Sequence, residues 1–398
     1  MPLPPLAEET LTTLLPELIE FRHDIHAHPE LGYEEDRTRD KICEALTAAG
    51  IEHKTGFAGG TGTIAHIPGS ADTAIALRAD IDALPIEELT GLPYASTHPG
   101  KMHACGHDGH TTVLLGAARV LKRLSNEGVL PNPVTFVFQP AEEGGGGGEK
   151  MCAEGCLDGS VVGPPARAMF GLHGWPSLPL GVVSSKPGPM LAAADHFTIT
   201  ITGIGGHAAM PHTTIDPIAA SAAVIQSLQH VVARRVDPVM GGVISVTSIH
   251  SGTTFNIIPA NTVLQGTLRA LFSEAQGILK AGLFELVEGV AAAHGCTAEI
   301  DYVVGYPVTN NDPGAMGDYQ AVADDLIGPS KAPLFELPCM GAEDFSYYGQ
   351  HVPACFFALG LIPEGQDAMP SVHHPCFDFN DDAIGIGVRM FIGLALQS

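Results

Sequence analysis

The amino-acid sequence predicts an α/β protein of two domains, one of them inserted into the other. The chain has 398 residues, and one hydrophobic core usually stops growing at roughly 250 to 300 residues. Short apolar runs alternate with helical patterns over residues 1–189, as they do in α/β domains. A β-α-β-β-α-β order replaces this alternation at 190–306, and the first pattern returns at 307–398.

The elements of the first part follow from their apolar patterns. Helices are expected at 8–27, 35–49 and 110–124 and near Lys150, and strands at 73–77, 134–138 and 168–172. The strand runs are short and apolar throughout, as buried parallel strands are. A run of five glycines, Gly144–Gly148, is equally consistent with a flexible linker and with a close approach of the backbone to a ligand.

The second part has the order of a ferredoxin-like domain. Strands are expected at 196–202, 243–250, 262–271 and 298–304, with helices at 217–233 and 274–293. A helix at 314–326, a strand at 354–359 and a last helix from about Asp382 then resume the first pattern. We therefore expect a discontinuous first domain.

Charge and composition exclude some classes of partner. The net charge of −25 argues against binding to nucleic acid or to an anionic membrane surface. The most apolar C-terminal run, Ile384–Leu396, contains Arg389, and no basic segment precedes an apolar run at the start. These features predict a cytoplasmic protein without a membrane span. The eight scattered cysteines favour reduced thiols over disulfides.

Histidines and carboxylates gather directly after predicted strands. These clusters are Arg78–Asp82, His103–His110, the pair Glu142 and Glu143, and His173. The carboxyl ends of the strands are where open α/β sheets place their ligand sites. Taken singly, each cluster has an ordinary explanation, such as a capping histidine, an exposed acidic pair or a buried thiol. Together they predict one site.

The residue types predict that this site binds divalent metal. Imidazole, thiolate and carboxylate are the ligands of borderline divalent ions, and a thiolate argues against magnesium or calcium. Two ions roughly 3.5 to 4 Å apart need a bridging ligand, for which Cys105 is the candidate. Of two adjacent carboxylates, one can bind metal while the other faces the attacking water as a general base. A further cluster, Val372–Pro375, would complete the site.

The ordered set of motifs resembles the aminoacylase-like family of two-metal peptidases and amidohydrolases, peptidase family M20. It is most similar to the branch of hippurate, N-acyl-amino-acid and auxin-conjugate hydrolases, and the resemblance covers nearly the whole chain. The matching segments are Arg22–Pro29, Arg78–Pro85, His103–His110, Gln139–Gly144 and Gly205–His207.

The resemblance implies a zinc-peptidase-like catalytic domain with an inserted ferredoxin-like lid or dimerisation domain. Glu142 matches the catalytic acid and base, and Asp80 the carboxylate that supports the metal site. His373 fits the spacing of the last ligand better than His374. The residues that match metal ligands are Cys105, His107, Glu143, His173 and His373.

The resemblance also implies roles for residues of the inserted domain. His207 matches a histidine that stabilises the reacting carbonyl, often from the neighbouring subunit, and Asn256 and Arg269 match positions that hold the substrate carboxylate. The ordinary alternatives are a loop cap for His207, a turn residue for Asn256 and a solubilising charge for Arg269. A homodimer or homotetramer through the lid is implied.

The expected function is hydrolysis of the amide bond of small N-acyl amino acids by two divalent ions, with zinc, manganese, cobalt and nickel all possible. The sequence leaves the acyl group, the amino acid and its stereochemistry open. Three alternatives remain: a dipeptidase or carboxypeptidase of the same family, a metal-containing binding protein without turnover, and a hydrolase that uses Cys105 as a nucleophile.

Overall fold

The computed structural model describes residues 2–335 and 338–397, and the chain divides into two compact units. The first comprises the described parts of Met1–Gly188, Asn310–Glu336 and Asp344–Ser398, and the second those of Pro189–Thr309 and Leu337–Glu343. Each unit has its own hydrophobic core. The sequence-based division left 338–343 in the second part of the first domain, but backbone bonds from Cys339 to Met190 and from Ala192 to Gly341 hold it in the second unit.

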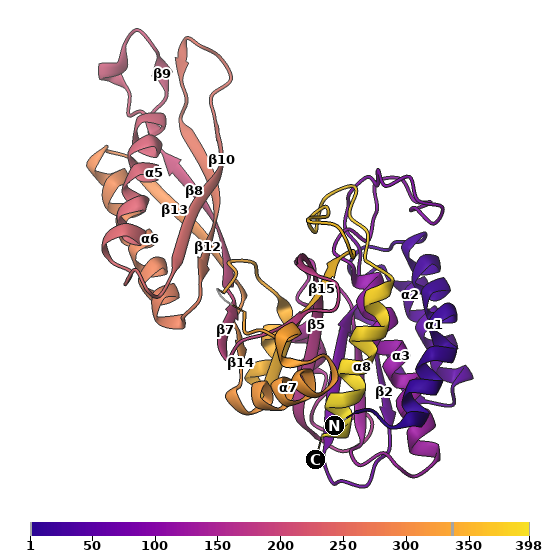
Figure 1. Cartoon of the computed structure of the whole chain (residues 1–398). Helices are drawn as coiled ribbons and strands as arrows, with labels where there is room; N and C mark the ends of the chain where they lie inside the picture. Colours follow the sequence, from indigo (N-terminus) through magenta and orange to yellow (C-terminus); the bar gives the residue numbers. More distant parts are fainter. Residues whose placement is uncertain (1, 336–337, 398) are drawn as a thin grey trace. The chain divides into compact units, whose positions relative to one another are not determined.

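The first unit is built on a seven-stranded sheet of order β1-β2-β4-β3-β5-β15-β6. Figure 1 labels its strands β2, β5 and β15. Neighbouring strands β4, β3, β5 and β15 run parallel, so their carboxyl ends meet at one edge of the sheet. Every residue of β2, β3, β4 and β15 is buried. The strands are β1 (Glu52–Phe57), β2 (Gly62–Ile67), β3 (Ala74–Asp80), β4 (Val134–Gln139), β5 (Ala166–Pro179), β6 (Val183–Ser184) and β15 (Ala354–Ile362).

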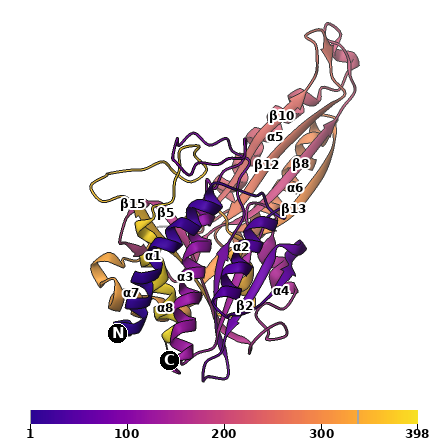
Figure 2. The same cartoon turned by 90° about the vertical axis from the view of Figure 1, so that its right-hand side faces the viewer.

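Helices pack onto this sheet through apolar side chains, and α1, α3 and α8 contact one another (Figure 2). The first turn of α7 is capped by Asp312, whose carboxylate accepts the N–H groups of Gly314 and Ala315 at 2.8 and 3.0 Å. The helices are α1 (Pro5–His26), α2 (Asp36–Ala48), α3 (His107–Asn126), α4 (Gly147–Ala153), α7 (Pro313–Leu326) and α8 (Asp382–Leu396). Among the described residues, none of the helices is both long and apolar enough to cross a membrane.

The end of the glycine run is a packed part of the fold and not a flexible linker. Its last two residues begin α4, and the backbone there is closely packed. A Cβ on Gly147 would lie 1.7 Å from the carbonyl oxygen of Pro140, and one on Gly148 would lie 2.7 Å from that of Asp344. Glycine is therefore required for α4 to pack closely enough to fix the loop that precedes it.

The second unit confirms the ferredoxin-like prediction. Its four-stranded sheet has the order β10-β12-β8-β13, every neighbouring pair is antiparallel, and α5 and α6 pack against it. Asp216 caps α5, which begins at Pro217, as N-terminal helix residues of these types do. The elements are β8 (Ala193–Thr202), α5 (Pro217–Arg234), β10 (Gly242–Ser251), β12 (Asn261–Ala270), α6 (Ser273–Ala293) and β13 (Thr297–Tyr306).

Sequence analysis missed the short and the polar elements. The hairpin β1–β2 was not predicted, because β1 exposes most of its polar residues and lacks an apolar run. The other missed strands have two to four residues. They are β6 (Val183–Ser184), β7 (Gly188–Leu191), β9 (Gly206–His207), β11 (Ile257–Ile258) and β14 (Thr309–Asn311). The 3-10 turns are η1 (Ala58–Gly60), η2 (Pro211–Thr213), η3 (Pro329–Lys331) and η4 (Asp344–Gln350).

Candidate metal centre

The carboxyl-end edge of the first unit's sheet brings the expected metal-ligand residues together. Three overlapping groups each have their ligand atoms within 4.8 Å of one another. Glu142, the expected acid and base, belongs to one of them. The groups are Cys105, His107 and His173; His107, Glu142 and Glu143; and Cys105, Glu143 and His373.

Hydrogen bonds occupy the Nδ1 atoms of two histidines, so that each ring directs its other nitrogen, Nε2, to the cluster. The Nδ1–H of His107 donates to the carbonyl oxygen of Asp82 at 2.9 Å. The Nδ1–H of His173 donates to the carbonyl oxygen of Gly174 at 2.8 Å, and its Nε2 lies 3.3 Å from Cys105 Sγ. Backbone carbonyls that bind the second ring nitrogen are the usual support of metal-bound histidine.

The centre contains buried polar atoms that need a partner. Within the described part of the chain, His107 Nε2 and Glu143 Oε1 are buried without a well-directed hydrogen bond. Such atoms are rare in folded proteins, because an unsatisfied polar group loses its bonds to water. A divalent cation would satisfy both atoms, and the thiol, imidazole and carboxylate around them suit zinc, manganese, cobalt or nickel. The residues therefore fit a metal centre.

The environment of Cys105 agrees with a metal ligand and disagrees with a free nucleophile. Burial and the negative charges of Glu143 and Glu142 raise the pKa of the Cys105 thiol well above its ordinary value. A nucleophilic cysteine needs the opposite, a lowered pKa that yields thiolate at neutral pH. A bound cation would deprotonate the thiol. The Cys105-nucleophile alternative is therefore disfavoured.

Carboxylates outnumber cations around His107. Burial opposes its charged form, but Asp80 and Asp82 raise the pKa of His107 to about 10. For Glu143, burial favours the neutral form, yet the adjoining His373 and the positive charge of His107 lower its pKa. The lowered pKa keeps the Glu143 carboxylate ionised, which favours binding of a cation.

Asp80 and Asp82 have different partners. Asp80 accepts from His110 Nδ1–H at 2.7 Å and from Arg78 at 2.8 Å, and it lies 3.7 Å from His107 Nε2. Asp82 lies 3.2 Å from His107 Nδ1 and accepts the backbone N–H of Glu143 at 3.0 Å. Asp82 thus touches two expected ligands, and the sequence analysis missed it. The sequence did contain a signal for Asp82, because this carboxylate follows the end of β3 by two residues.

His110 lies in the cluster but is already bound. Its Nδ1–H donates to Asp80, and its Nε2 accepts the backbone N–H of Gly174 at 2.8 Å. Both ring nitrogens are therefore used, and the ring is held as a neutral imidazole. Its role is to orient Asp80 and the end of β5 beside His173.

The loops that carry Glu142 and His373 have unusual backbone conformations. Ala141, directly before Glu142, has φ +53°, and His373 has φ +63°. Residues other than glycine rarely adopt this left-handed region, and such strain gathers at functional sites. A bond from the Ala141 N–H to Glu35 at 2.9 Å and one from the His373 N–H to the Ala104 carbonyl at 2.7 Å hold them.

The structure distinguishes the two adjacent histidines near the C-terminus. His373 Nε2 lies 3.2 Å from Glu143 Oε1, and His373 belongs to a metal-capable group. His374 instead accepts the backbone N–H of Cys376 through Nδ1 at 3.1 Å. His374 therefore caps a local turn, while His373 faces the cluster.

The comparisons with known proteins agree with this geometry. The model of a family described as peptidase family M20/M25/M40 matches residues 76–397. The chain belongs to this family. Over 376 residues it is 41% identical to an N-acetyl-L-cysteine deacetylase of Bacillus subtilis, with 94% of this chain and 86% of the relative covered.

Two further comparisons extend over almost the whole M20 chain. It is 40% identical over 389 residues to IAA-amino acid hydrolase ILR1-like 4 of Arabidopsis thaliana, covering 96% of this chain and 85% of the relative. The crystal structure of the Bacillus subtilis YXEP protein, described as a dinuclear metal binding peptidase from the M20 family, superimposes with a TM-score of 0.82. That structure is 34% identical, with 97% of this chain and 98% of the other covered.

In this M20 chain, the expected substrate residues of the second unit fall into two groups. His207 and Asn256 are neighbours, because β9 pairs with β11 and the Ala208 N–H donates to the Asn256 carbonyl at 3.0 Å. Both side chains are exposed. Arg269 lies near the other end of β12, eight residues beyond Asn261, which is about 26 Å along an extended strand.

The contacts of these three side chains are sparse. His207 Nδ1 accepts the N–H of Ala209 at 3.0 Å, so the ring caps its own loop through one nitrogen. Asn256 Oδ1 accepts the hydroxyl of Thr254 at 3.0 Å. Arg269 is half-buried beside Asp195, and burial lowers its pKa. His207 thus caps its loop and Asn256 takes part in a turn, and each of these contacts uses only one polar atom of the side chain.

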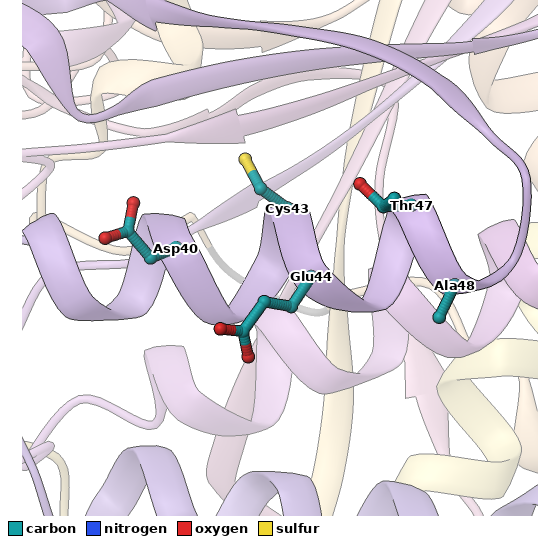
Figure 3. Close-up of a pocket in the computed structure, with 5 residues that line it drawn as sticks. All are labelled: Asp40, Cys43, Glu44, Thr47 and Ala48. Carbon is teal, nitrogen blue, oxygen red and sulfur yellow. The ribbon is translucent and has the colours of Figure 1, made fainter.

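A surface hollow on α2 is a separate feature of this M20 chain (Figure 3). Two carboxylates and a thiol contribute to its lining, and none of its residues belongs to the metal-capable groups found among the described residues. The hollow therefore takes no part in the metal centre. It is lined by Asp40, Cys43, Glu44, Thr47 and Ala48.

Proposed function

We propose that this M20 chain is a two-metal amidohydrolase that hydrolyses N-acyl amino acids to a carboxylic acid and a free amino acid. The observation that carries the proposal is the buried Glu142 carboxylate, which adjoins a cluster of five side chains that could hold metal. The names of two relatives near 40% identity, a deacetylase of N-acetyl-L-cysteine and an IAA-amino acid hydrolase, support amide hydrolysis. Zinc, manganese, cobalt and nickel all suit the donors.

In this proposal, the side chains that would hold two divalent ions per chain are Cys105, His107, Glu143, His173 and His373. When bound, the ions would lower the pKa of the attacking water and polarise the amide carbonyl. Glu142 accepts the proton of that water and returns it to the leaving amine. Asp80 and Asp82 keep His107 and the Glu143 loop in place, as supporting carboxylates do.

The second unit supplies the groups that recognise the substrate. His207 donates to the oxygen of the tetrahedral intermediate, a contribution typically worth about a hundredfold in turnover. Arg269 and Asn256 bind the carboxylate of the amino acid, because a charged hydrogen bond to carboxylate is stronger than a neutral one. The imidazole of His207 and the amide of Asn256 are exposed and available for these contacts.

We also propose that two or four copies assemble through the second unit. Arg269 and the His207 loop lie at opposite ends of β12, so one copy cannot easily direct both at one small substrate. β13 is an edge strand with exposed Val303 and Val304, and edge strands favour pairing with another chain. Light scattering measures the assembly directly. Mixing the two impaired variants Glu142→Gln and His207→Ala should raise activity above that of either variant alone if each site uses both copies.

The test of the function is metal analysis together with a substrate panel. Purified protein should contain about two divalent ions per chain and hydrolyse N-acetyl or N-benzoyl amino acids, and a chelator should abolish this activity. Faster hydrolysis of unblocked dipeptides would instead assign the chain as a dipeptidase or carboxypeptidase. Binding of N-acyl amino acids without turnover in metal-loaded protein would assign it as a binding protein.

A further inference from the structure

A second buried polar cluster lies beside the metal centre, and its centre is Arg22. The Arg22 side chain is completely buried, near the end of α1. Its Nε donates to Asp381 at 2.5 Å, and one terminal nitrogen donates to Asp108 and Asp378, each at 3.0 Å. The other terminal nitrogen donates to the hydroxyl of Tyr94 at 3.0 Å. All three guanidinium nitrogens are thus bound.

The partners of Arg22 come from segments that carry the metal centre. Asp108 directly follows His107. Asp378 and Asp381 follow His373 by five and eight residues, on the loop between β15 and α8. One guanidinium therefore joins the start of α3 to the loop that holds the C-terminal ligand. A purely local stabilisation of α1 by Arg22 would leave this choice of partners unexplained.

Tyr94 closes the same cluster from a third segment. Its hydroxyl donates to Asp378 at 2.8 Å while it accepts from Arg22. Its ring stacks on His23, with 3.6 Å between the ring centroids. A backbone bond from Leu89 to the carbonyl of Pro375, at 2.8 Å, fastens the same loop two residues after His373. The loop is thus held at Pro375 as well as at its aspartates.

His373 itself has few other supports. Its side chain is 51% exposed, and its backbone has φ +63°. The contacts that hold it are the N–H bond to Ala104 and the approach to Glu143. Close packing of the loop on α3 comes after the histidine, where a Cβ on Gly109 would lie 2.4 Å from the Phe379 ring. The position of His373 therefore depends on how the loop is tied down.

We propose that Arg22 is a positioning residue for His373, and that through it Arg22 sets the affinity of the metal ion that His373 binds. This inference rests on the proposed metal centre. The guanidinium fixes the distance between the start of α3, with Cys105 and His107, and the His373 loop. Tyr94, Asp378 and Asp381 complete the hydrogen-bonded cluster that holds the His373 loop. Supporting groups of this kind typically change metal affinity by about 10- to 100-fold.

The experiment measures metal retention, without substrate. Wild-type protein, Arg22→Met and His373→Ala are loaded with zinc and dialysed against increasing concentrations of a chelator, and zinc per chain is measured. Both variants should fall from two ions to one at a chelator concentration at least about tenfold lower than wild type requires. The second ion of each variant should be lost at the same, higher chelator concentration at which wild type loses its second ion. Excess zinc should restore the missing ion in Arg22→Met.

A matched control is Arg119→Met. Arg119 on α3 also pairs with α1, through Glu17 at 2.8 Å, but the pair lies on the surface. It should retain both ions as wild type does. In the double variant Arg22→Met with His373→Ala, metal retention should equal that of His373→Ala alone, because Arg22 acts through His373. An additional loss in the double variant overturns the inference and makes Arg22 a general structural residue.

A milder substitution keeps the test decisive if Arg22→Met does not fold. Tyr94→Phe removes one hydroxyl from the cluster and should weaken retention of the same ion severalfold. If Arg22→Met folds and retains zinc as wild type does, the inference is wrong. If Arg22→Met does not fold, the same result in Tyr94→Phe overturns the inference. If His373→Ala keeps both ions, the proposed metal centre itself is wrong. If His373→Ala loses one ion and Arg22→Met loses none, only the positioning role fails.

Discussion

The candidate residues of the first unit are fixed by their surroundings, whereas those of the second unit are largely free. His107 and Glu142 are 1% and 7% exposed, and carbonyls or carboxylates hold the rings and loops around them. His207 and Asn256 lie exposed on loops, each with one local side-chain hydrogen bond. The first set is organised before any ligand arrives, and the second is not.

This difference separates two kinds of contribution. Buried, charged groups cost stability unless a partner or a metal compensates them, so changes in the first unit should alter metal content, pH dependence or chemistry. Exposed loop residues cost little to the folded state. Changes in the second unit should therefore alter kinetics with substrate and leave the metal content and melting temperature as they are.

Replacing Glu142 with glutamine should cause the largest effect. The variant keeps the shape of the side chain but cannot accept a proton, so turnover should fall by about a thousandfold or more. Both ions should remain, since Glu142 is not among the proposed ligands. The measurements are kcat and metal per chain, with Glu149→Gln, an exposed position on α4, as the control. Turnover within tenfold of wild type would remove Glu142 from its role.

His26 is buried beside the Arg22 cluster, with its Nδ1 2.9 Å from Asp108, and should make the stability of the first unit depend on pH. Burial opposes its charged form, but Asp108 and Glu88 raise the pKa of His26 to about 9 from 6.5. The raised pKa contributes stability that is complete below pH 6.5 and is lost as the pH rises through 9. Because a tenfold change in proton affinity corresponds to about 1.4 kcal/mol, the loss of unfolding free energy is up to about 3 kcal/mol.

The measurement is the free energy of unfolding of metal-free protein between pH 6 and 10. The difference between wild type and His26→Gln isolates the contribution of His26 from that of the other ionisable groups. That difference should shrink as the pH rises. His250→Gln, at an exposed position of the second unit, should run parallel to wild type. A constant difference for His26→Gln would show that His26 is neutral in the folded protein.

The same contrast explains how much could be predicted from the sequence. The order of the ferredoxin-like elements and the gathering of the histidine and carboxylate clusters followed from short apolar runs with polar residues after them. These patterns are local in the sequence. The parallel sheet brings them together, because the carboxyl ends of its strands meet at one edge. The choice of Cys105, His107, Glu143 and His173 within these clusters followed from the family resemblance. The choice of His373 over His374 rested on spacing, and the geometry around Glu143 agrees with it.

What the sequence could not supply were contacts between distant segments. Arg22 pairs with Asp381 across 359 residues, and a basic residue on an amphipathic helix ordinarily indicates a solvated face. Asp82 was passed over for Asp80, because the alternation of side chains along β3 does not say which carboxylate reaches His107. The polar strand β1 had no apolar run to reveal it.

For the second unit, His207→Ala should reduce turnover by about a hundredfold, or about 2.7 kcal/mol, by removing a donor to the oxyanion. Metal content and melting temperature should not change, because the side chain is exposed. His212→Ala, at an exposed position of the same loop, is the matched control. A loss of metal in His207→Ala, or a change in turnover below threefold, would contradict the distinction between the two units.

Arg269 should give the smallest effect and the sharpest test of substrate recognition. Replacement with methionine should raise KM about tenfold, or about 1.4 kcal/mol, with little change in kcat, because the lost ion pair is uniform in the ground and transition states. The increase should vanish for substrates whose carboxylate is converted to an amide. Arg269→Lys should recover part of the affinity, since it keeps the charge without the paired donors. An equal increase for the amide substrate would mean that Arg269, half-buried beside Asp195, maintains the second unit rather than reads the carboxylate.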